Sequence, residues 1–172
     1  SISFNMFNKD APWADVRVRE AIAHAIDGDA IVKGLFHGIP KRYPRLAPGE
    51  FAYDPSLKNP DYDPAKARKL LAEAGYPKGF DMPLVYAVSG TGIRETVEAS
   101  LLYLKAVGIT AHPQGMEMHQ ILDMLRTDRE KPFVGLQEMP LANAGSNSLE
   151  ALLIAYHSKL RGVVYKNEGF DG

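Results

Sequence analysis

Strand-like and helix-like segments alternate through the second half of the chain, and this order limits the fold more than any other feature of the sequence. The strand-like segments are 82–88, 109–113 and 132–137, and the helix-like segments are 93–107, 117–127 and 149–156. Apolar residues recur at helical spacing in the helix-like segments, whereas the strand-like ones are short apolar runs. Such an order is typical of layered α/β structures. We therefore predict an α/β fold with a mixed sheet flanked by helices.

The stretch "PWADVRVREAIAHAID" (12–27) begins like a strand and ends like a helix. Its apolar residues keep the spacing of one helical face, so we predict a helix. Asp15 lies near the start of this helix, where the positive end of the helix dipole favours an acidic side chain. We expect Arg17 and Glu20, three positions apart, to pair on the exposed side. The charges then mark a helix boundary rather than a binding surface.

The remaining N-terminal segments complete the predicted lobe. "SISFNMFN" (1–8) alternates apolar and polar residues and predicts a strand. We expect Asp27 to cap a second helix and Asp63 to cap a third, which ends at Gly75. The proline-rich segment 39–62 predicts a long ordered loop. The predicted core contains Val18, Ile22, Leu70, Leu71, Val85, Val97, Leu101, Leu104 and Ile121.

The composition excludes several classes of partner. The 20 Lys and Arg residues are balanced by 21 Asp and Glu, which gives a formal net charge of −1, so we expect no nucleic-acid partner. No apolar run approaches the roughly 20 residues that a helix needs to cross a bilayer, so we expect no direct membrane insertion. Without cysteine, the chain has no disulfide and no thiolate metal site. Its 172 residues suit one domain.

The motifs of common catalytic and cofactor sites are absent from the sequence. The five histidines show neither H-x-x-x-H nor H-E-x-x-H spacing, so we expect no bound metal. No serine lies in a G-x-S-x-G elbow. "SGTG" (89–92) is neither a G-x-G-x-x-G nor a Walker A sequence, so we expect no nucleotide or other cofactor. We therefore predict that the chain is not an enzyme.

The loop after strand 82–88 is the first candidate binding site. In "AVSGTGIRET", Ser89 and Thr91 lie where backbone N–H groups and a helix dipole can hold an anion. Arg94 falls in the first turn of the next helix, where a cation is mildly unfavourable. It therefore either reaches outward to an acidic partner or is tolerated at the surface. Met139 follows a second strand end, the usual ligand position in open α/β sheets.

Three motifs in a fixed order resemble a known family. They are "FNMFNKDAPWADVRVREAIAHAID", "YDPAKARKLLAEAGYPKGF" and "LKAVGI". With "YKNEGFD" near the end, the resemblance covers almost the whole chain. The chain is thereby similar to the family 5 solute-binding proteins of peptide and nickel ABC importers, which include dipeptide- and oligopeptide-binding proteins.

The resemblance implies that residues 1–172 form most of one lobe of a two-lobed protein, with a type II periplasmic-binding-protein-like fold. Residues 1–8 would be the strand that crosses into this lobe, and the partner lobe and a C-terminal segment would lie outside these residues. The implied function is capture of a peptide or related small solute and its delivery to the permease subunits of an ABC importer, without chemistry on the solute. The implied location is periplasmic, or extracellular and membrane-anchored in a Gram-positive host.

The resemblance also assigns binding residues. Arg94 lies where dipeptide-binding members place an arginine that pairs with the C-terminal carboxylate of the peptide. Such members carry Trp-x-x-Asp after the fourth strand to hold the ligand, whereas this chain has "EMPLANAGSNS", in which Met139 and Ala142 fall nearest. Glu138 can replace the absent aspartate if its side chain faces the cleft. The candidate ligand-binding residues are Ser89, Thr91, Arg94, Glu138, Met139 and Asn143.

Other functions stay open at this point. The aspartate of the Trp-x-x-Asp pattern holds the ammonium group of a peptide, and a buried ammonium group without a partner costs on the order of several kcal/mol. A non-peptide solute, such as an opine, a sugar or a metal chelate, is therefore an alternative. Two further alternatives are a small α/β enzyme domain and an interaction or receptor domain of the same fold. A deep pocket of titratable groups would favour the enzyme.

Overall fold

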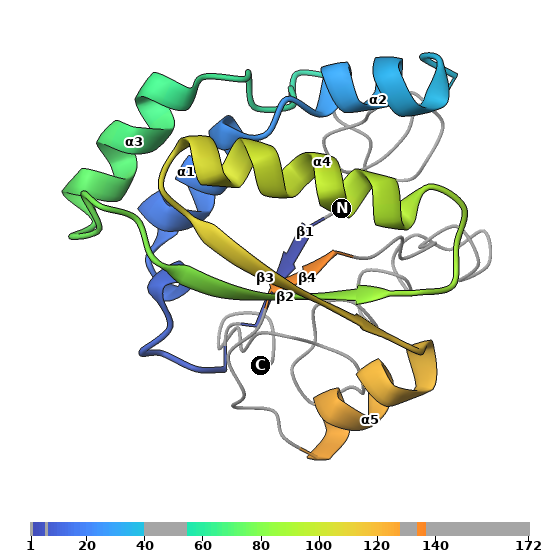
Figure 1. Ribbon diagram of the computed structural model, residues 1–172. Helices are drawn as coiled ribbons and strands as arrows, with labels where there is room; N and C mark the ends of the chain where they lie inside the picture. Colours follow the sequence, from blue (N-terminus) through green and yellow to red (C-terminus); the bar gives the residue numbers. More distant parts are fainter. Residues whose placement is uncertain (1, 6, 40–54, 128–133, 137–172) are drawn as a thin grey trace.

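The computed structural model describes residues 2–5, 7–39, 55–127 and 134–136 (Figure 1). The strands are β1 (Ile2–Phe4), β2 (Asp81–Ala87), β3 (Thr110–Met116) and β4 (Val134–Leu136). The helices are the short 3-10 helix η1 (Pro12–Ala14), α1 (Val16–Ala25), α2 (Gly28–Phe36), α3 (Pro64–Glu73), α4 (Ile93–Ala106) and α5 (Met118–Thr127). Within these described ranges, every helix is too short or too polar to span a bilayer.

The four strands form one sheet in the order β1-β4-β2-β3. Strand β2 runs parallel to both of its neighbours, with Leu84 opposite Val134 of β4 and Tyr86 opposite Gly115 of β3. Strand β1 pairs with β4 in the antiparallel direction. The mixed sheet flanked by helices that the sequence predicts is therefore confirmed.

Side chains alternate along β2 and supply two hydrophobic clusters, one on each face of the sheet. Met82 and Leu84 pack in the larger cluster with residues of α1, α3 and α4. Val85 and Ala87 point to the other face, where they pack with residues of α5. Figure 1 shows α4 over one face of the sheet and α5 on the other side. Burial of both faces is typical of a parallel sheet.

The three helix starts that the sequence predicts from aspartates are confirmed. Each aspartate side chain accepts a backbone N–H two or three residues ahead, at 2.8–2.9 Å: Asp15 from Arg17, Asp27 from Ala30 and Asp63 from Lys66. The first N–H groups of a helix lack partners within the helix, so these side chains satisfy donors that would otherwise need water. The C-terminal prediction also holds for α3, where Gly75 follows the helix with a positive φ.

Most of the predicted core is buried, with two exceptions. Leu71 and Leu104 are among the fully buried side chains, whereas Leu70 and Leu101 are only half-buried and pack at the margin of the cluster. Consecutive residues of a helix point about 100° apart, so Leu70 lies at the edge of the face whose centre Leu71 occupies. The larger cluster also contains Trp13, which is 1% exposed and which apolar spacing alone did not predict.

The segments that lead into β2 and β3 approach closely at Gly79 and Gly108. A Cβ atom on Gly79 would lie 1.8 Å from the carbonyl oxygen of Gly108, so that position admits only glycine. Both residues have positive φ, 78° and 94°, which L side chains rarely adopt. The N–H of Thr110 donates to the carbonyl oxygen of Phe80 at 3.0 Å beside this contact. The close approach aligns the starts of the two parallel strands.

Some element boundaries differ from the sequence predictions. Strand β1 is shorter than the predicted segment 1–8 because the chain turns at Asn5, whose side-chain oxygen accepts the N–H of Phe7 at 3.1 Å. Strand β3 is longer than the predicted segment 109–113, since it pairs with β2 as far as Met116. Residues 40–54 of the predicted loop and the helix predicted at 149–156 lie outside the described residues.

Replacing Leu71 by Ala should lower the free energy of unfolding by about 2–5 kcal/mol, because the substitution leaves a cavity in the core. Leu71 is 1% exposed. The matched control is Leu102→Ala on α4, where the leucine is 73% exposed and the expected change is within about 0.5 kcal/mol. Urea denaturation of both variants measures the difference. Equal losses for the two variants would contradict the placement of α3.

Candidate functional site

The loop after β2 and the end of β3 lie together at one edge of the sheet. The N–H of Val88 donates to the carbonyl oxygen of Met116 at 3.0 Å, which continues the strand pairing by one step. Ser89 and Thr91 follow Val88 and are both exposed. Carboxyl ends of parallel strands are the usual ligand position in open α/β sheets. The structure therefore places these two predicted residues at the expected edge.

Arg94 lies in the first turn of α4 at the same edge, with a side chain that is 78% exposed. Its Nε atom donates to Oε1 of Glu98, one turn further along the helix, at 3.1 Å. This hydrogen bond from Arg94 is the main reason why the pKa of the guanidinium is raised above its usual range, and Coulombic interactions with Glu98 and Tyr86 act in the same direction. The sequence left two alternatives for Arg94, an acidic partner or tolerance at the surface. In the structure Arg94 lies at the surface, and its acidic partner, Glu98, is on its own helix.

Two residues at this edge were missed in the sequence analysis, Tyr86 and Gly115. They face each other across β2 and β3, and a Cβ atom on Gly115 would lie 3.0 Å from the hydroxyl oxygen of Tyr86. The Tyr86 ring therefore lies over the backbone of the edge strand. A glycine inside a strand is a sequence signal for close approach of another group, but the sequence does not say which group approaches.

Glu138, Met139 and Asn143 lie outside the described residues, as does the rest of "EMPLANAGSNS". The described site therefore consists of the loop 88–92, the start of α4 and the end of β3.

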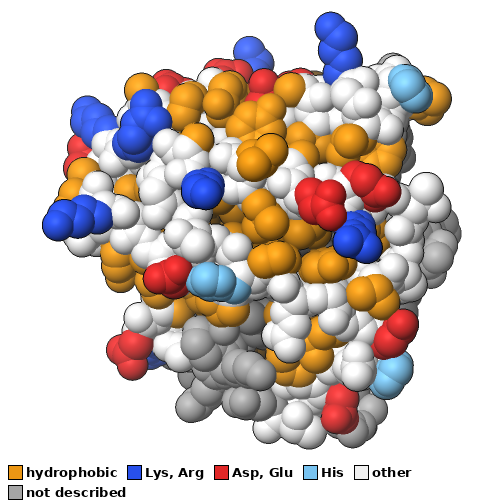
Figure 2. Space-filling view, viewed as in Figure 1, with side chains coloured by type: hydrophobic (Ala, Val, Ile, Leu, Met, Phe, Trp, Pro, Cys, Tyr) orange, Lys and Arg blue, Asp and Glu red, His pale blue; other side chains and the backbone are white. Residues whose placement is uncertain are grey.

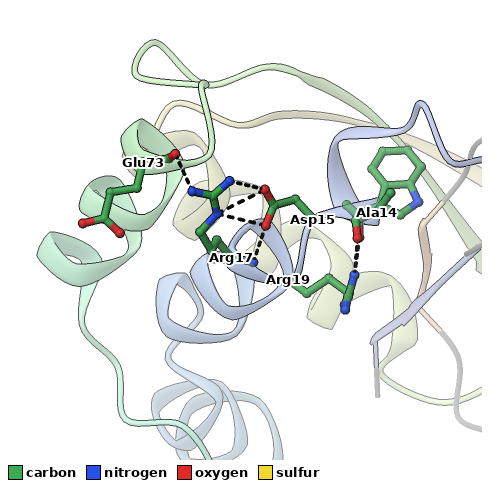
Figure 3. Close-up of polar contacts among 6 residues, drawn as sticks. Ala14, Asp15, Arg17, Arg19 and Glu73 are labelled. Carbon is green, nitrogen blue, oxygen red and sulfur yellow. Dashed lines mark hydrogen bonds and ion pairs between the residues drawn. The ribbon is translucent and has the colours of Figure 1, made fainter.

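The charged stretch 12–27 holds elements together away from this edge (Figure 3). The guanidinium of Arg17 bonds both carboxylate oxygens of Asp15, at 2.6–3.1 Å. Its Nη1 atom also donates to the carbonyl oxygen of Glu73 at the end of α3, at 2.7 Å. The pairing of Arg17 with Glu20 expected from their spacing is therefore wrong, because Arg17 turns toward the cap of its own helix and the end of α3.

Arg19 and Trp13, which lie near Arg17 in the sequence, also bond backbone oxygens of the protein. Nη1 of Arg19 donates to the carbonyl oxygens of Trp13 and Ala14, at 2.7 and 2.9 Å. The indole Nε1 of Trp13 donates to the carbonyl oxygen of Asn5 at 2.9 Å, and both residues are buried. These bonds connect the segment after β1 to the start of α1. The interpretation of this stretch as a helix boundary is thus supported.

Basic side chains on α3 form a solvated face. Lys66, Arg68 and Lys69 are exposed, and blue side chains gather over this helix in Figure 2. Lys69 lies 3.9 Å from Glu73, and Nη1 of Arg68 donates to the carbonyl oxygen of Ala106 at 3.3 Å. Across the middle of the same view, hydrophobic side chains gather between charged ones (Figure 2).

Two histidines in the described ranges, His24 and His112, contact a backbone carbonyl and a carboxylate. Nδ1 of His24 lies 2.7 Å from the carbonyl oxygen of Asp61, which joins α1 to the segment before α3. Nε2 of His112 lies 2.9 Å from Oδ1 of Asp81 on the neighbouring strand. Within these ranges, no three histidine or carboxylate side chains are grouped so as to hold a metal ion.

Comparison with known proteins identifies similar chains. A sequence profile described as "Bacterial extracellular solute-binding proteins, family 5 Middle" matches residues 1–155. The glutathione-binding protein GsiB of Escherichia coli K12 is 37% identical over 119 residues, which cover 69% of this chain and 23% of that protein. The chain thus spans about a quarter of the length of the curated relatives it matches.

Solved structures share the fold over nearly the whole chain. The periplasmic binding protein DppA of Helicobacter pylori, in complex with the peptide STSA, superposes with a TM-score of 0.79 at 21% identity, covering 99% of this chain and 33% of that chain. AgaA from A. tumefaciens R10, in complex with agropinic acid, superposes with a TM-score of 0.79 at 22% identity. This match covers 99% of this chain and 35% of AgaA. At such identities the likeness demonstrates the fold alone.

Replacing Asp15 by Asn should make stability less dependent on pH at the acidic end. The hydrogen bonds from Arg17 hold the pKa of Asp15 below its ordinary value of 3.8, so the stabilisation is present above that value and is lost as the pH falls through the lowered pKa. Asparagine is also a good N-cap, so the substitution removes mainly the charge. Thermal unfolding from neutral to strongly acidic pH should therefore show a destabilisation of Asp15→Asn that shrinks as the pH falls.

The control for this experiment is Glu20→Gln, which removes the partner that the sequence spacing suggests. Its thermal midpoint should follow that of the unsubstituted protein across the same pH range. A pH-dependent loss in Glu20→Gln equal to that in Asp15→Asn would contradict the assignment of Arg17 to Asp15.

Proposed function

The chain belongs to family 5 of the bacterial extracellular solute-binding proteins, and from this premise we propose that it is part of the solute-capturing component of an ABC importer. The observation that carries the proposal is the family match over residues 1–155, joined to an exposed polar loop at the carboxyl edge of the sheet. In this role the protein binds a solute, releases it to permease subunits and performs no chemistry on it. The proposed location is the periplasm, or the outer face of the membrane.

The proposed architecture has two lobes, of which residues 1–172 form one. Support comes from the lengths of the similar proteins. The match covers 23% of GsiB, and 99% of this chain superposes on only 33–35% of two solved binding proteins. The partner lobe and a C-terminal segment would then belong to a longer protein, and β1 would enter this lobe from the other. Closure of two lobes around a ligand is a common hinge motion of periplasmic binding proteins.

The proposed solute is a peptide or a related small molecule that carries a carboxylate. Arg94 supplies a guanidinium at the ligand edge, and its fork geometry suits a carboxylate. Ser89 and Thr91 add hydroxyl groups and backbone N–H groups beside it. GsiB is named for glutathione and the DppA structure holds a peptide, which favours peptide-like solutes.

A non-peptide acid is the second candidate. AgaA has the same fold and holds agropinic acid, and this chain lacks the Trp-x-x-Asp pattern expected for an ammonium group. Glu138 and Met139 would contribute from the second strand end in either case. The two candidates share the carboxylate and differ in whether the solute also presents an ammonium group.

Arg94→Ala in the longer protein should weaken binding of acidic solutes by at least about five-fold, because closure removes the water that screens the ion pair. Calorimetry with reduced glutathione, the peptide STSA and agropinic acid measures the effect. The matched control is Lys105→Ala, which removes an exposed cation from the last turn of the same helix and should leave affinity unchanged. Equal losses in both variants would point to a general charge effect and contradict a carboxylate site at Arg94.

Residues 1–172 alone should bind the same solutes far more weakly than the longer protein. Binding between lobes buries most of a small ligand and uses polar groups from both sides, whereas an exposed ion pair on one lobe contributes little. Calorimetry on both proteins, after circular dichroism has shown that the shorter one is folded, measures the ratio. Equal affinities would place the whole site within these residues and refute the two-lobed proposal.

A further inference from the structure

The Tyr86 side chain lies over Gly115, a residue of the neighbouring strand that has no side chain. Gly115 is directly opposite Tyr86 in the pairing of β2 with the edge strand β3. A Cβ atom on Gly115 would lie 3.0 Å from both Cζ and the hydroxyl oxygen of Tyr86, and 2.7 Å from Cγ1 of Val88. The phenol end of Tyr86 and the side chain of Val88 therefore occupy the space above Gly115.

Backbone conformation does not require glycine at position 115. Its φ lies outside the left-handed range, unlike the φ of Gly79 and Gly108. The atoms that a Cβ would meet are the ends of two side chains, and side chains can move without moving the strand. An alanine at 115 is thus compatible with the fold, and its main consequence would be to displace Tyr86 and Val88.

The Tyr86 hydroxyl is positioned to meet a solute. Tyr86 packs against the larger hydrophobic cluster, and the residue is only half-buried. In the described ranges, no hydrogen bond is recorded for this hydroxyl. Val88 beside it is 49% exposed, and Gly115 is exposed. Tyr86 on β2 and Arg94 at the start of α4 flank the loop 88–92 at the same edge of the sheet.

We propose that Tyr86 is a solute-binding residue and that Gly115 determines specificity by leaving room for it. In this arrangement Arg94 takes the carboxylate, the Tyr86 hydroxyl donates to that carboxylate or to the carbonyl next to it, and Val88 contacts an apolar group. The recognised chemistry is an acidic solute with a carbonyl beside its carboxylate, as at the C-terminus of a peptide. This inference rests on the proposed solute-binding function and refines the site at the same sheet edge.

A purely structural role for the pair makes a different prediction. An aromatic ring that covers a glycine on an edge strand can fix the register of the strands. In that case the ring alone matters, so Tyr86→Phe would change neither stability nor binding. The hydroxyl matters only if it contacts the solute, and this difference makes the two roles separable.

The experiment compares four single substitutions in the longer protein. Tyr86→Phe removes only the hydroxyl, and its control is Tyr103→Phe, a half-buried tyrosine on α4 that contacts Tyr62. Gly115→Ala adds one methyl group, and its control is Gly34→Ala in α2, where a Cβ would meet nothing within 4 Å. Calorimetry with reduced glutathione, the peptide STSA and agropinic acid gives affinities, and thermal unfolding gives stabilities.

Tyr86→Phe should lower the affinity for at least one of these probes about three- to ten-fold, as expected for one lost hydrogen bond. Its thermal midpoint should be unchanged. Gly115→Ala should weaken binding of the same probe at least as much, and both control variants should bind all probes as the unsubstituted protein does. If both test variants stay within about two-fold while Arg94→Ala loses affinity, the inference is overturned and the proposed function stands. If the unsubstituted protein shows saturable binding of none of the three probes, the proposed function fails and the inference fails with it.

Discussion

The parallel pairing of β2 with both of its neighbours is the constraint on which the rest of the described structure depends. Parallel strands cannot be joined by a tight hairpin, so the chain must return across the sheet after each strand. Helices α4 and α5 lie in those returns, and each covers one face. As a result the ends of β2 and β3 meet at one edge, whereas their starts are held together by the approach of Gly79 to Gly108. The edge with Arg94 and Tyr86 is thus a consequence of strand direction.

The most recognisable charged stretch of the sequence stabilises the lobe at another place. Arg17 joins the cap of α1 to the last turn of α3, Arg19 bonds backbone oxygens just before α1, and Trp13 bonds the carbonyl oxygen of Asn5 after β1. All of these partners belong to the protein itself. The motif that suggests the family therefore describes how this part of the chain is held together, whereas the proposed solute site is at the edge of the sheet.

Local rules predicted the elements well, and contacts between distant segments account for what they missed. Each aspartate cap depends on a hydrogen bond between residues two or three positions apart, so the residues involved can be recognised directly in the sequence. Arg17 bonds the carboxylate of Asp15 and a carbonyl 56 positions away, so spacing on one helix favoured Glu20 wrongly. Gly115 has its explanation on the neighbouring strand, in the side chains of Tyr86 and Val88. Arg94 was found because its place after a strand is a local feature.

The exposed ion pair between Arg94 and Glu98 leaves the guanidinium available to a solute at the proposed site. The pair is exposed at both ends, 78% and 62%, so water screens it and it holds the guanidinium only weakly. A solute carboxylate can therefore replace Glu98 as the partner of the guanidinium with little loss of free energy while the edge is open to water. In the proposed two-lobed protein, closure would exclude that water, so the carboxylate of an acidic solute would gain a stronger ion pair with the guanidinium than it has on the open surface. Under this proposal, discrimination in favour of acidic solutes would arise at the closing step, from a residue that is an ordinary surface cation in the described structure.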